Sequence, residues 1–275
     1  SLARTSFNRQ RDAMLDMFGI IIECDRRGGN RYYIYNEEDL RQDSVQNWMF
    51  STISVSQLLS ERNRLFSRII MERVPSADRH LKTLLETMYK NQKVSMVYQR
   101  YEAEAAKSYK ACPYCLKLFN RRWYVVMKVE TLKPLKPLDP SNSVRVFSLD
   151  RIKSLELLPE KFKMPDDFNA SNFFSECFGV VVGDGTQAVT IRLRAFGRER
   201  FAMHDLPIHH SQQLIAKGPD YFDFEVCLRP TADFRAFLAS KGQWLVVLSP
   251  QNLSDEIVQI HREALEKYAC MREHL

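Results

Sequence analysis

The chain has 275 residues, of which 45% are hydrophobic and 27% are charged, so it can fill the cores of two domains and is not expected to be disordered. No run approaches the roughly 20 apolar residues of a membrane span, no signal peptide is recognisable, and six thinly spread cysteines suit a reducing compartment, so we expect a cytoplasmic protein. The net charge of +6 favours an anionic partner.

The first third of the chain predicts helices around one hairpin. Apolar residues recur at helical spacing through residues 2–18, with arginines among them, which predicts a basic amphipathic helix. Two β-rich runs at 20–25 and 31–35 flank a Gly-Gly turn and predict a hairpin. Residues 37–71 are helical in character, and a further helix is predicted over 76–92.

After Lys93 the apolar period changes to two, which is typical of a small antiparallel barrel or sandwich. The expected strands are 93–101, 110–119, 121–130, 143–149 and 152–158. From Gln187 strands and helices alternate, which predicts an α+β plait-like module. The expected order is strand 188–193, helix 197–205, strands 212–218 and 221–229, helix 231–240, strand 243–249 and helix 254–270.

The stretch Cys112-Pro113-Tyr114-Cys115 reads like the active-site motif of a glutaredoxin. That chemistry needs the first cysteine at a helix N-terminus, where the dipole stabilises a thiolate, but β-forming residues follow here. We therefore predict two core cysteines on opposite faces of a strand. A zinc site would need a second cysteine or histidine pair at suitable spacing, and neither occurs.

The same stretch belongs to an ordered series of strand residues. The series runs from Tyr98 through Pro113-Tyr114, the turn 120–122 and the aromatic strand at Trp123 to "RVFSLDRI" at 145–152. It resembles the WYL domain, a family named for the Trp-Tyr-Leu at the place occupied here by Trp123, Tyr124 and Val125. The valine departs from the family's leucine but is also apolar and favours strands.

The resemblance extends in both directions along the chain. The residues from 188 onward resemble the extension that commonly follows WYL domains, and residues 4–34 resemble the recognition helix and wing of a winged helix-turn-helix, whose first two helices we expect to be missing here. The implied fold is α+β, with a partial winged helix at 1–36, a helical linker at 37–92, an Sm-like or SH3-like antiparallel β-barrel at 93–160, a connecting segment at 161–186 and the extension at 187–275.

The resemblance implies a bacterial transcriptional regulator whose barrel senses an anionic effector, a nucleotide or short single-stranded nucleic acid, and adjusts duplex DNA binding. Guanidinium forks suit phosphate and flat aromatic rings suit bases. The candidate effector residues are Tyr98, Arg122, Tyr124, Arg145 and Arg151, with Arg100, Lys110 and Trp123 as second choices. Alternatives stay open for four of them: Trp123 as a core residue, Arg151 as the partner of Asp150 in a structural ion pair, Arg122 as a solvated charge beside the turn, and Lys110 as an exposed strand residue.

The candidate DNA contacts lie in the first 31 residues. Arginine suits guanine and asparagine suits adenine in the major groove, while basic residues of a wing reach phosphate. The groove candidates are Arg4, Thr5, Asn8 and Arg9, and the wing candidates are Arg26, Arg27 and Arg31. The alternative is a basic, solvated surface.

Enzymatic activity is not expected, because the sequence has no Walker loop, no GxSxG and no HExxH. We accordingly expect no catalytic residue, metal or cofactor. The expected partners are duplex DNA, the effector and a second copy of the chain, since winged-helix regulators read paired half-sites. The alternatives are a nucleic-acid-binding module without regulatory role and, less favoured, a thiol oxidoreductase using Cys112 and Cys115.

Overall fold

The computed structural model describes residues 4–18, 21–25, 29, 31–35, 80–130, 143–182 and 185–273. The chain divides into two compact units, Ser1–Glu72 and Arg73–Leu275. Its sheets are antiparallel and its helices lie between and beside them, which confirms the α+β class. Of the described helices, none combines the length and the hydropathy needed to span a membrane. The helical segment predicted at 37–71 lies outside the described residues.

The first unit contains the predicted helix and hairpin. Helix α1 (Arg4–Phe18) is followed by strands β1 (Ile22–Asp25) and β2 (Arg31–Ile34), which pair antiparallel. The rings of Phe7 and Tyr32 lie 4.6 Å apart, so the apolar side of α1 contacts the hairpin. Helix and hairpin are therefore one packed element, as the amphipathic pattern predicts.

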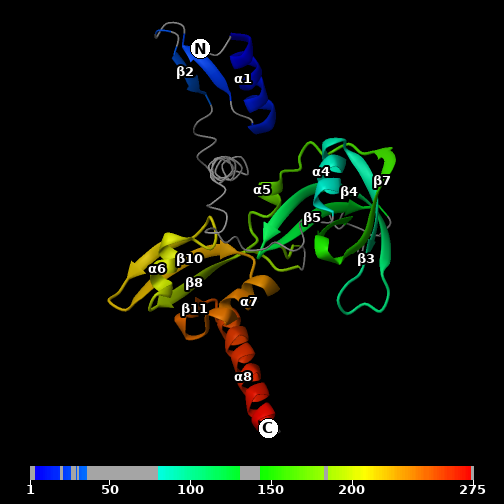
Figure 1. The fold of residues 1–275 in the computed structure, drawn as a ribbon. Coiled ribbons are helices and arrows are strands. Elements are labelled where there is room, and N and C mark those ends of the chain that lie inside the picture. The colour runs from blue at the N-terminus through cyan, green and yellow to red at the C-terminus, as the bar shows by residue number, and fades with distance from the viewer. Residues whose placement is uncertain are drawn as a thin grey trace, which may run out of the picture. The chain divides into compact units, whose positions relative to one another are not determined.

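Five antiparallel strands form the first sheet of the second unit, as the period of two predicted. They are β3 (Gln92–Tyr98), β4 (Lys107–Phe119), β5 (Arg122–Val129), β6 (Val144–Ser148) and β7 (Ile152–Lys161), in the order β6-β5-β4-β3-β7. The sheet is strongly curved (Figure 1). Its edge strands β6 and β7 do not pair with each other among the described residues, so these strands do not form a closed barrel.

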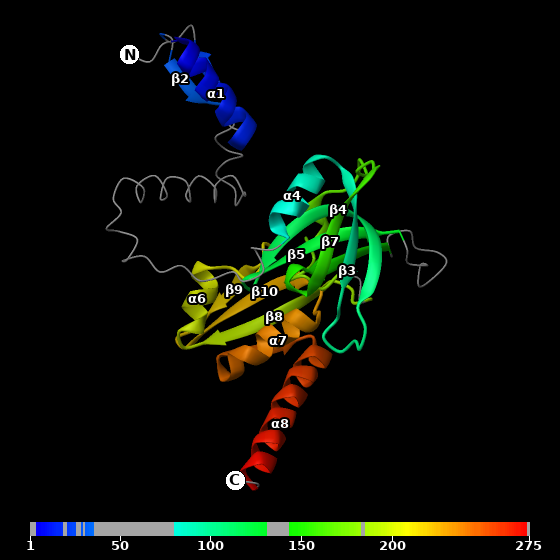
Figure 2. The same ribbon diagram turned by 45° about the vertical axis from the view of Figure 1, so that its right-hand side comes forward.

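One face of this sheet is covered by α4 (Leu81–Tyr89) (Figure 2). Leu84 of that helix is fully buried, in one cluster with strand residues such as Met96, Val125 and Met127. The sequence prediction assigned these helical residues to the end of a linker. The structure instead makes α4 part of the sheet's own core, because Leu84 completes its apolar face.

The opposite face carries a second cluster, built from Cys112, Tyr114, Cys115 and Val126 and covered by phenylalanines of the segment after β7. Cys112 and Cys115 were predicted on opposite faces, and that prediction is wrong. The register of β4 against β5 shifts between Pro113 and Cys115, which marks a β-bulge, and the extra residue returns Cys115 to the face of Cys112.

The C-terminal part has the element order βαββαβ followed by a long helix. The elements are β8 (Val189–Phe196), α6 (Glu199–Asp205), β9 (Gln213–Lys217), β10 (Tyr221–Leu228), α7 (Ala232–Lys241), β11 (Leu245–Ser249) and α8 (Gln251–Glu273). All pairings in its sheet are antiparallel, in the order β11-β8-β10-β9. This is the split βαβ order of the predicted plait.

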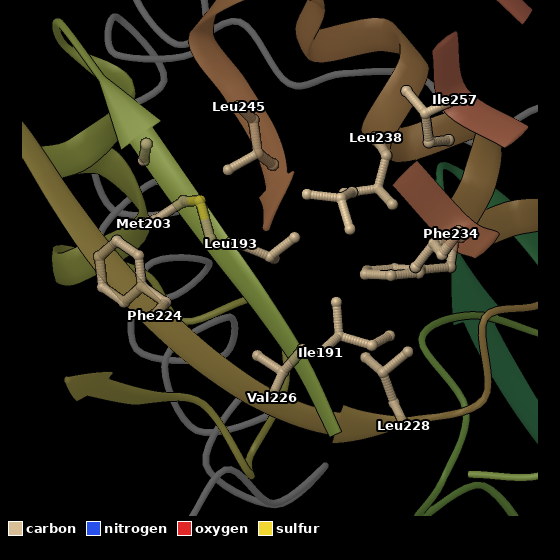
Figure 3. Close-up of a cluster of buried hydrophobic side chains, with 13 residues drawn as sticks. Ile191, Leu193, Met203, Phe224, Val226, Leu228, Phe234, Leu238, Leu245 and Ile257 are labelled. Atoms are coloured by element: carbon tan, nitrogen blue, oxygen red, sulfur yellow. The ribbon is translucent and has the colours of Figure 1, made fainter. Parts of the chain in front are cut away.

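The plait has its own hydrophobic core (Figure 3). Alternate residues of β8, Ile191 and Leu193, point to the side of the sheet that the helices cover. There they meet Phe234 and Leu238 of α7 and Ile257 of α8, in a cluster whose members are nearly all fully buried. Packing of this kind makes the plait a rigid body.

The connecting segment after β7 joins the curved sheet to the plait. Lys117 of β4 donates its Nζ to the carbonyl of Gly179 at 2.6 Å, and Phe119 lies edge-on to Phe178 at 5.7 Å. On the plait side, the carboxylate of Asp233 accepts hydrogen bonds from two successive backbone amides of the segment. Burial lowers the pKa of Lys117, which fits its place between the two sheets.

Candidate functional site

The candidate site lies at the end of the curved sheet where two turns meet. Asn120 and Arg121 connect β4 to β5 with positive φ values of 47° and 61°, the conformation of a two-residue hairpin turn. Arg122 therefore begins β5. Since Tyr124 of β5 pairs with Ser148 at the end of β6, Arg122 lies beside the short helix η3 (Leu149–Arg151) that leads into β7.

Five residues form what we call the arginine cluster: Tyr98, Tyr101, Arg122, Asp150 and Arg151. The carboxylate of Asp150 joins three side chains through its two oxygens. Arg122 Nε lies 3.5 Å from Oδ2, the Tyr101 hydroxyl donates to the same oxygen at 3.5 Å, and the Ser148 hydroxyl donates to Oδ1. The guanidinium of Arg151 stacks 3.7 Å from the centroid of the Tyr101 ring.

Tyr98 lies on the buried side of the cluster. Tyr98 is 7% exposed and its ring lies edge-on to Phe147 at 5.0 Å, so the ring belongs to the core. Burial raises the pKa of the Tyr98 hydroxyl, and the positive charge of the neighbouring Arg151 partly offsets that rise. The hydroxyl thus lies close to Arg151, while the ring is not free for a base to stack on.

Arg151 keeps an unused hydrogen-bond donor. Its Nε is buried and has no hydrogen-bond partner among the described residues. A buried guanidinium donor without an acceptor is costly, and an anionic oxygen is the acceptor that suits it best. Arg122 is also positively charged at any physiological pH: partial burial lowers its pKa, but Asp150, Tyr101 and Tyr124 together raise it more. The cluster therefore offers two guanidinium groups against one carboxylate.

Asp150 pairs with Arg122, and no ion pair between Asp150 and Arg151 is found in the described ranges. The side chains therefore do not form the alternative structural ion pair between Asp150 and Arg151. Both Arg122 and Asp150 are about one-third exposed, so their ion pair contributes little to stability.

Tyr124 and Trp123 occupy opposite faces of β5, as alternation predicts. Tyr124 lies on the same face as Arg122 and is half-buried. Trp123 packs against the core on the α4 side, which agrees with the core alternative for this residue. Arg145 pairs in register with the buried Met127, so it too faces the α4 side and lies across the sheet from Arg122.

Two further predicted residues lie away from the cluster. Arg100 was expected to share a strand face with Tyr98, but β3 ends at Tyr98 and Arg100 is exposed in the turn that follows. Lys110 lies on the face opposite to Tyr109 and binds Glu160 at 2.8 Å. The structure thus brings together three of the eight predicted effector residues, with Tyr124 beside them.

Comparison with known proteins places these residues in a family. Residues 79–157 match the family model of the WYL domain. The chain contains a WYL domain. The match begins just before α4 and ends within β7, so it includes every residue of the arginine cluster.

Several solved structures resemble the chain, among them the following two. Proteasome accessory factor B/C (PafBC) of Arthrobacter aurescens matches 94% of this chain at 18% identity and a TM-score of 0.33. A CRISPR Cas-related protein matches 71% of it at 13% identity and a TM-score of 0.44. This chain spans 40% and 53% of the length of those two proteins. No curated protein matches it.

Sequence reasoning missed Tyr101 and the central role of Asp150. Tyr101 is 68% exposed and stands in a polar turn after β3, where a large aromatic residue has no packing role. That exposure in a turn is the signal that could have identified it. The geometry of Asp150 had no sequence signal, because Arg122 is 28 residues away and reaches it only through strand pairing.

Some of the residues predicted to contact DNA lie within the described part of the chain. Arg4 and Thr5 lie on α1, where Asn8 and Arg9 are exposed, and Arg31 is exposed at the start of β2. Arg26 and Arg27 lie outside the described residues.

The two cysteines of the glutaredoxin-like motif are in an environment that suppresses the thiolate. Both lie within β4, where no helix begins. Burial raises the pKa of the Cys115 thiol to about 11, and burial together with Glu130 raises that of Cys112. These features oppose the oxidoreductase alternative, because a reactive cysteine needs a lowered pKa and access to its substrate.

Proposed function

We propose that this chain is part of a ligand-responsive DNA-binding transcriptional regulator whose WYL domain binds an anionic effector at the arginine cluster. The observation that carries the proposal is the buried Nε of Arg151, which has no hydrogen-bond partner among the described residues while its guanidinium is held on the Tyr101 ring. A group ordered in this way is already in place for an acceptor, so the ligand need not supply the free energy of ordering it.

The chemistry of the cluster favours a phosphate-bearing ligand with a base. Arg122 and Arg151 flank Asp150 and present planar, permanently charged groups, which match phosphate oxygens better than ammonium groups do. One face of the Tyr101 ring is covered by Arg151, and because the residue as a whole is 68% exposed, its ring leaves room for a stacked base. A nucleotide or a short single strand supplies both features, and we propose the single strand as the first ligand to test.

Fluorescence anisotropy with labelled single-stranded oligonucleotides at two salt concentrations tests this site. We expect binding that weakens with salt and falls at least tenfold in Arg122→Ala. Arg145→Ala is the matched control, since it removes the same charge from the other face of the same sheet. Equal losses in both variants would assign the binding to net charge, and binding unaffected by Arg122→Ala would remove the site.

The regulatory part of the proposal requires coupling between two ligands. Binding of the effector must change the affinity for duplex DNA, and by the same factor DNA must change the affinity for the effector. Measuring duplex binding with and without saturating oligonucleotide therefore separates a regulator from a nucleic-acid-binding module without regulatory role. A coupling factor of one would favour the second.

A further inference from the structure

Helix α8 is longer than the part of it that packs. At about 1.5 Å per residue its 23 residues extend about 34 Å. Only its first two turns reach the plait core, through the buried Leu253 and Ile257. From Arg262 to Arg272 every residue is exposed, and both ribbon views show the helix extending away from the plait (Figures 1 and 2). This second half has no packing partner in the described part of the unit Arg73–Leu275.

The apolar stripe of α8 nevertheless continues beyond the plait. Its members recur every three or four residues along one side of the helix. They are Leu253, Ile257, Ile260, Ala264, Tyr268 and Met271. The first two are buried, whereas Ile260, Tyr268 and Met271 are 37%, 70% and 65% exposed. The same side of the helix that packs on the plait is therefore uncovered farther along. The exposed part from Arg262 to Arg272 has 11 residues, and a helical segment of that length without tertiary support is marginal in water.

We infer that this stripe pairs with the same stripe of a second copy of the chain, in antiparallel orientation. The charges along the stripe support a second copy in that orientation. Glu263 and Lys267 lie on one edge of the stripe, one turn apart. In an antiparallel pair equal edges face each other, so Glu263 of each copy lies opposite Lys267 of its partner, and two ion pairs form about the twofold axis.

A parallel pair would have the opposite charge pattern. The edge with Lys267 would then face the other edge, where Arg272 stands, and two cations would meet in each half of the interface. The plait is also attached at the N-terminal end of α8, so an antiparallel pair places the two plaits at opposite ends, where they do not collide. Charge and shape agree on the antiparallel form.

Sedimentation equilibrium of the intact chain tests the interface without DNA or effector, so its outcome is independent of the proposed function. We expect a dimer for the unmodified chain and a monomer for Tyr268→Glu, which places a carboxylate in the centre of the stripe. The matched control is Ala269→Glu, which makes the same charge change at an exposed position on the back of the helix and leaves the dimer intact. A monomeric chain at the highest attainable concentration, or a dimeric Tyr268→Glu variant, would overturn the inference.

Engineered disulfides test the orientation. Ala264→Cys lies near the twofold axis of an antiparallel pair and should cross-link two copies under mild oxidation. In that arrangement the two Met271→Cys residues of a pair lie about 18 Å apart along the helices, at 1.5 Å per residue over about twelve residues. This variant should therefore cross-link no more than the unmodified chain does. Equal cross-linking at both positions would indicate a parallel pair and contradict the antiparallel inference.

Discussion

Two arginine–tyrosine stacks, one in each half of the larger unit, look alike and differ in what else the arginine binds. In the WYL domain Arg151 lies 3.7 Å from the ring centre of Tyr101, and in the plait Arg194 lies 3.8 Å from that of Tyr221. Arg194 also makes two hydrogen bonds to Asp223, at 2.7 and 2.8 Å. Arg151 has no such bidentate carboxylate, and its Nε has no hydrogen-bond partner among the described residues.

The difference separates a structural stack from one whose arginine has a hydrogen-bond donor without a partner among the described residues. The hydrogen bonds that Arg194 donates to Asp223 raise the pKa of Arg194 and occupy the two guanidinium donors that a phosphate would use. The carboxylate near Arg151 is instead directed at Arg122, at the longer distance of 3.5 Å. Of these two stacks, only that of Arg151 has a buried donor without a partner among the described residues, which is why we assign ligand binding to Arg151 and a structural role to Arg194.

The largest expected effect is on the free energy of unfolding, from a substitution in the plait core. Phe234 is fully buried, so Phe234→Ala should lower the free energy of unfolding by about 3–5 kcal/mol. Urea denaturation followed by circular dichroism measures it. A loss below about 1 kcal/mol would show that the plait does not act as the rigid scaffold in this comparison.

The next largest effect is the difference in stability lost when Asp223 or Asp150 is replaced. Asp223→Ala leaves Arg194 without its bidentate partner and should cost about 2 kcal/mol of stability, since hydrogen bonds to charged groups contribute about 1.5–3 kcal/mol. Asp150→Ala breaks a more exposed pair and should cost less than about 1 kcal/mol, while strengthening oligonucleotide binding because it removes a negative charge. Equal costs in denaturation, or weaker binding by Asp150→Ala, would contradict the distinction.

Replacing Tyr101 or Tyr221 should have different effects on the affinity for oligonucleotides. Tyr101→Ala should weaken oligonucleotide affinity roughly fivefold, about 1 kcal/mol, at the lower end of the range for base stacking. Tyr101→Phe retains the ring and should bind nearly as the unmodified chain does. Tyr221→Ala removes the equivalent ring in the plait and should leave anisotropy titrations unchanged; a matching loss there would place nucleic acid on both stacks.

The smallest expected effect is a pH dependence from the plait. Burial lowers the pKa of His209, whose two ring nitrogens lie near Ser211 Oγ and the Ser175 carbonyl. The unfolded chain therefore binds the proton more readily, so stability is complete above the ordinary histidine pKa of about 6.5 and declines as the pH falls below it. Denaturation at pH 5.5 and 7.5 should show this decline, and it should shrink in His209→Gln.

The order of elements could be predicted well from the sequence, because each period of apolar residues reports a local backbone preference. The helix and hairpin of the first unit, the five strands and the βαββαβ order all follow from local pattern. The cysteine faces were predicted wrongly because a bulge at Pro113–Cys115 shifts the alternation by one residue. Such a shift depends on pairing with β5, which no local pattern records.

The candidate site was predictable only in its residue types. Arg122 and Arg151 could be selected because cations interleaved with aromatic residues suit an anionic ligand. Their meeting at Asp150 depends on the register of β5 against β6 and on the turn at η3, both of which are tertiary facts. Arg145 has the same chemistry as Arg122 but faces the other side of the sheet, so residue type alone could not rank the two.

Whether the ligand binds at Arg151 is tested most directly by comparing the two stacks in one titration. Oligonucleotide affinity is measured by anisotropy for Arg151→Gln and Arg194→Gln, at a temperature where circular dichroism shows both variants folded. We expect the dissociation constant to rise at least tenfold, about 1.4 kcal/mol, for Arg151→Gln and to stay unchanged for Arg194→Gln. Unchanged binding by Arg151→Gln, or an equal loss in both variants, would contradict ligand binding at Arg151.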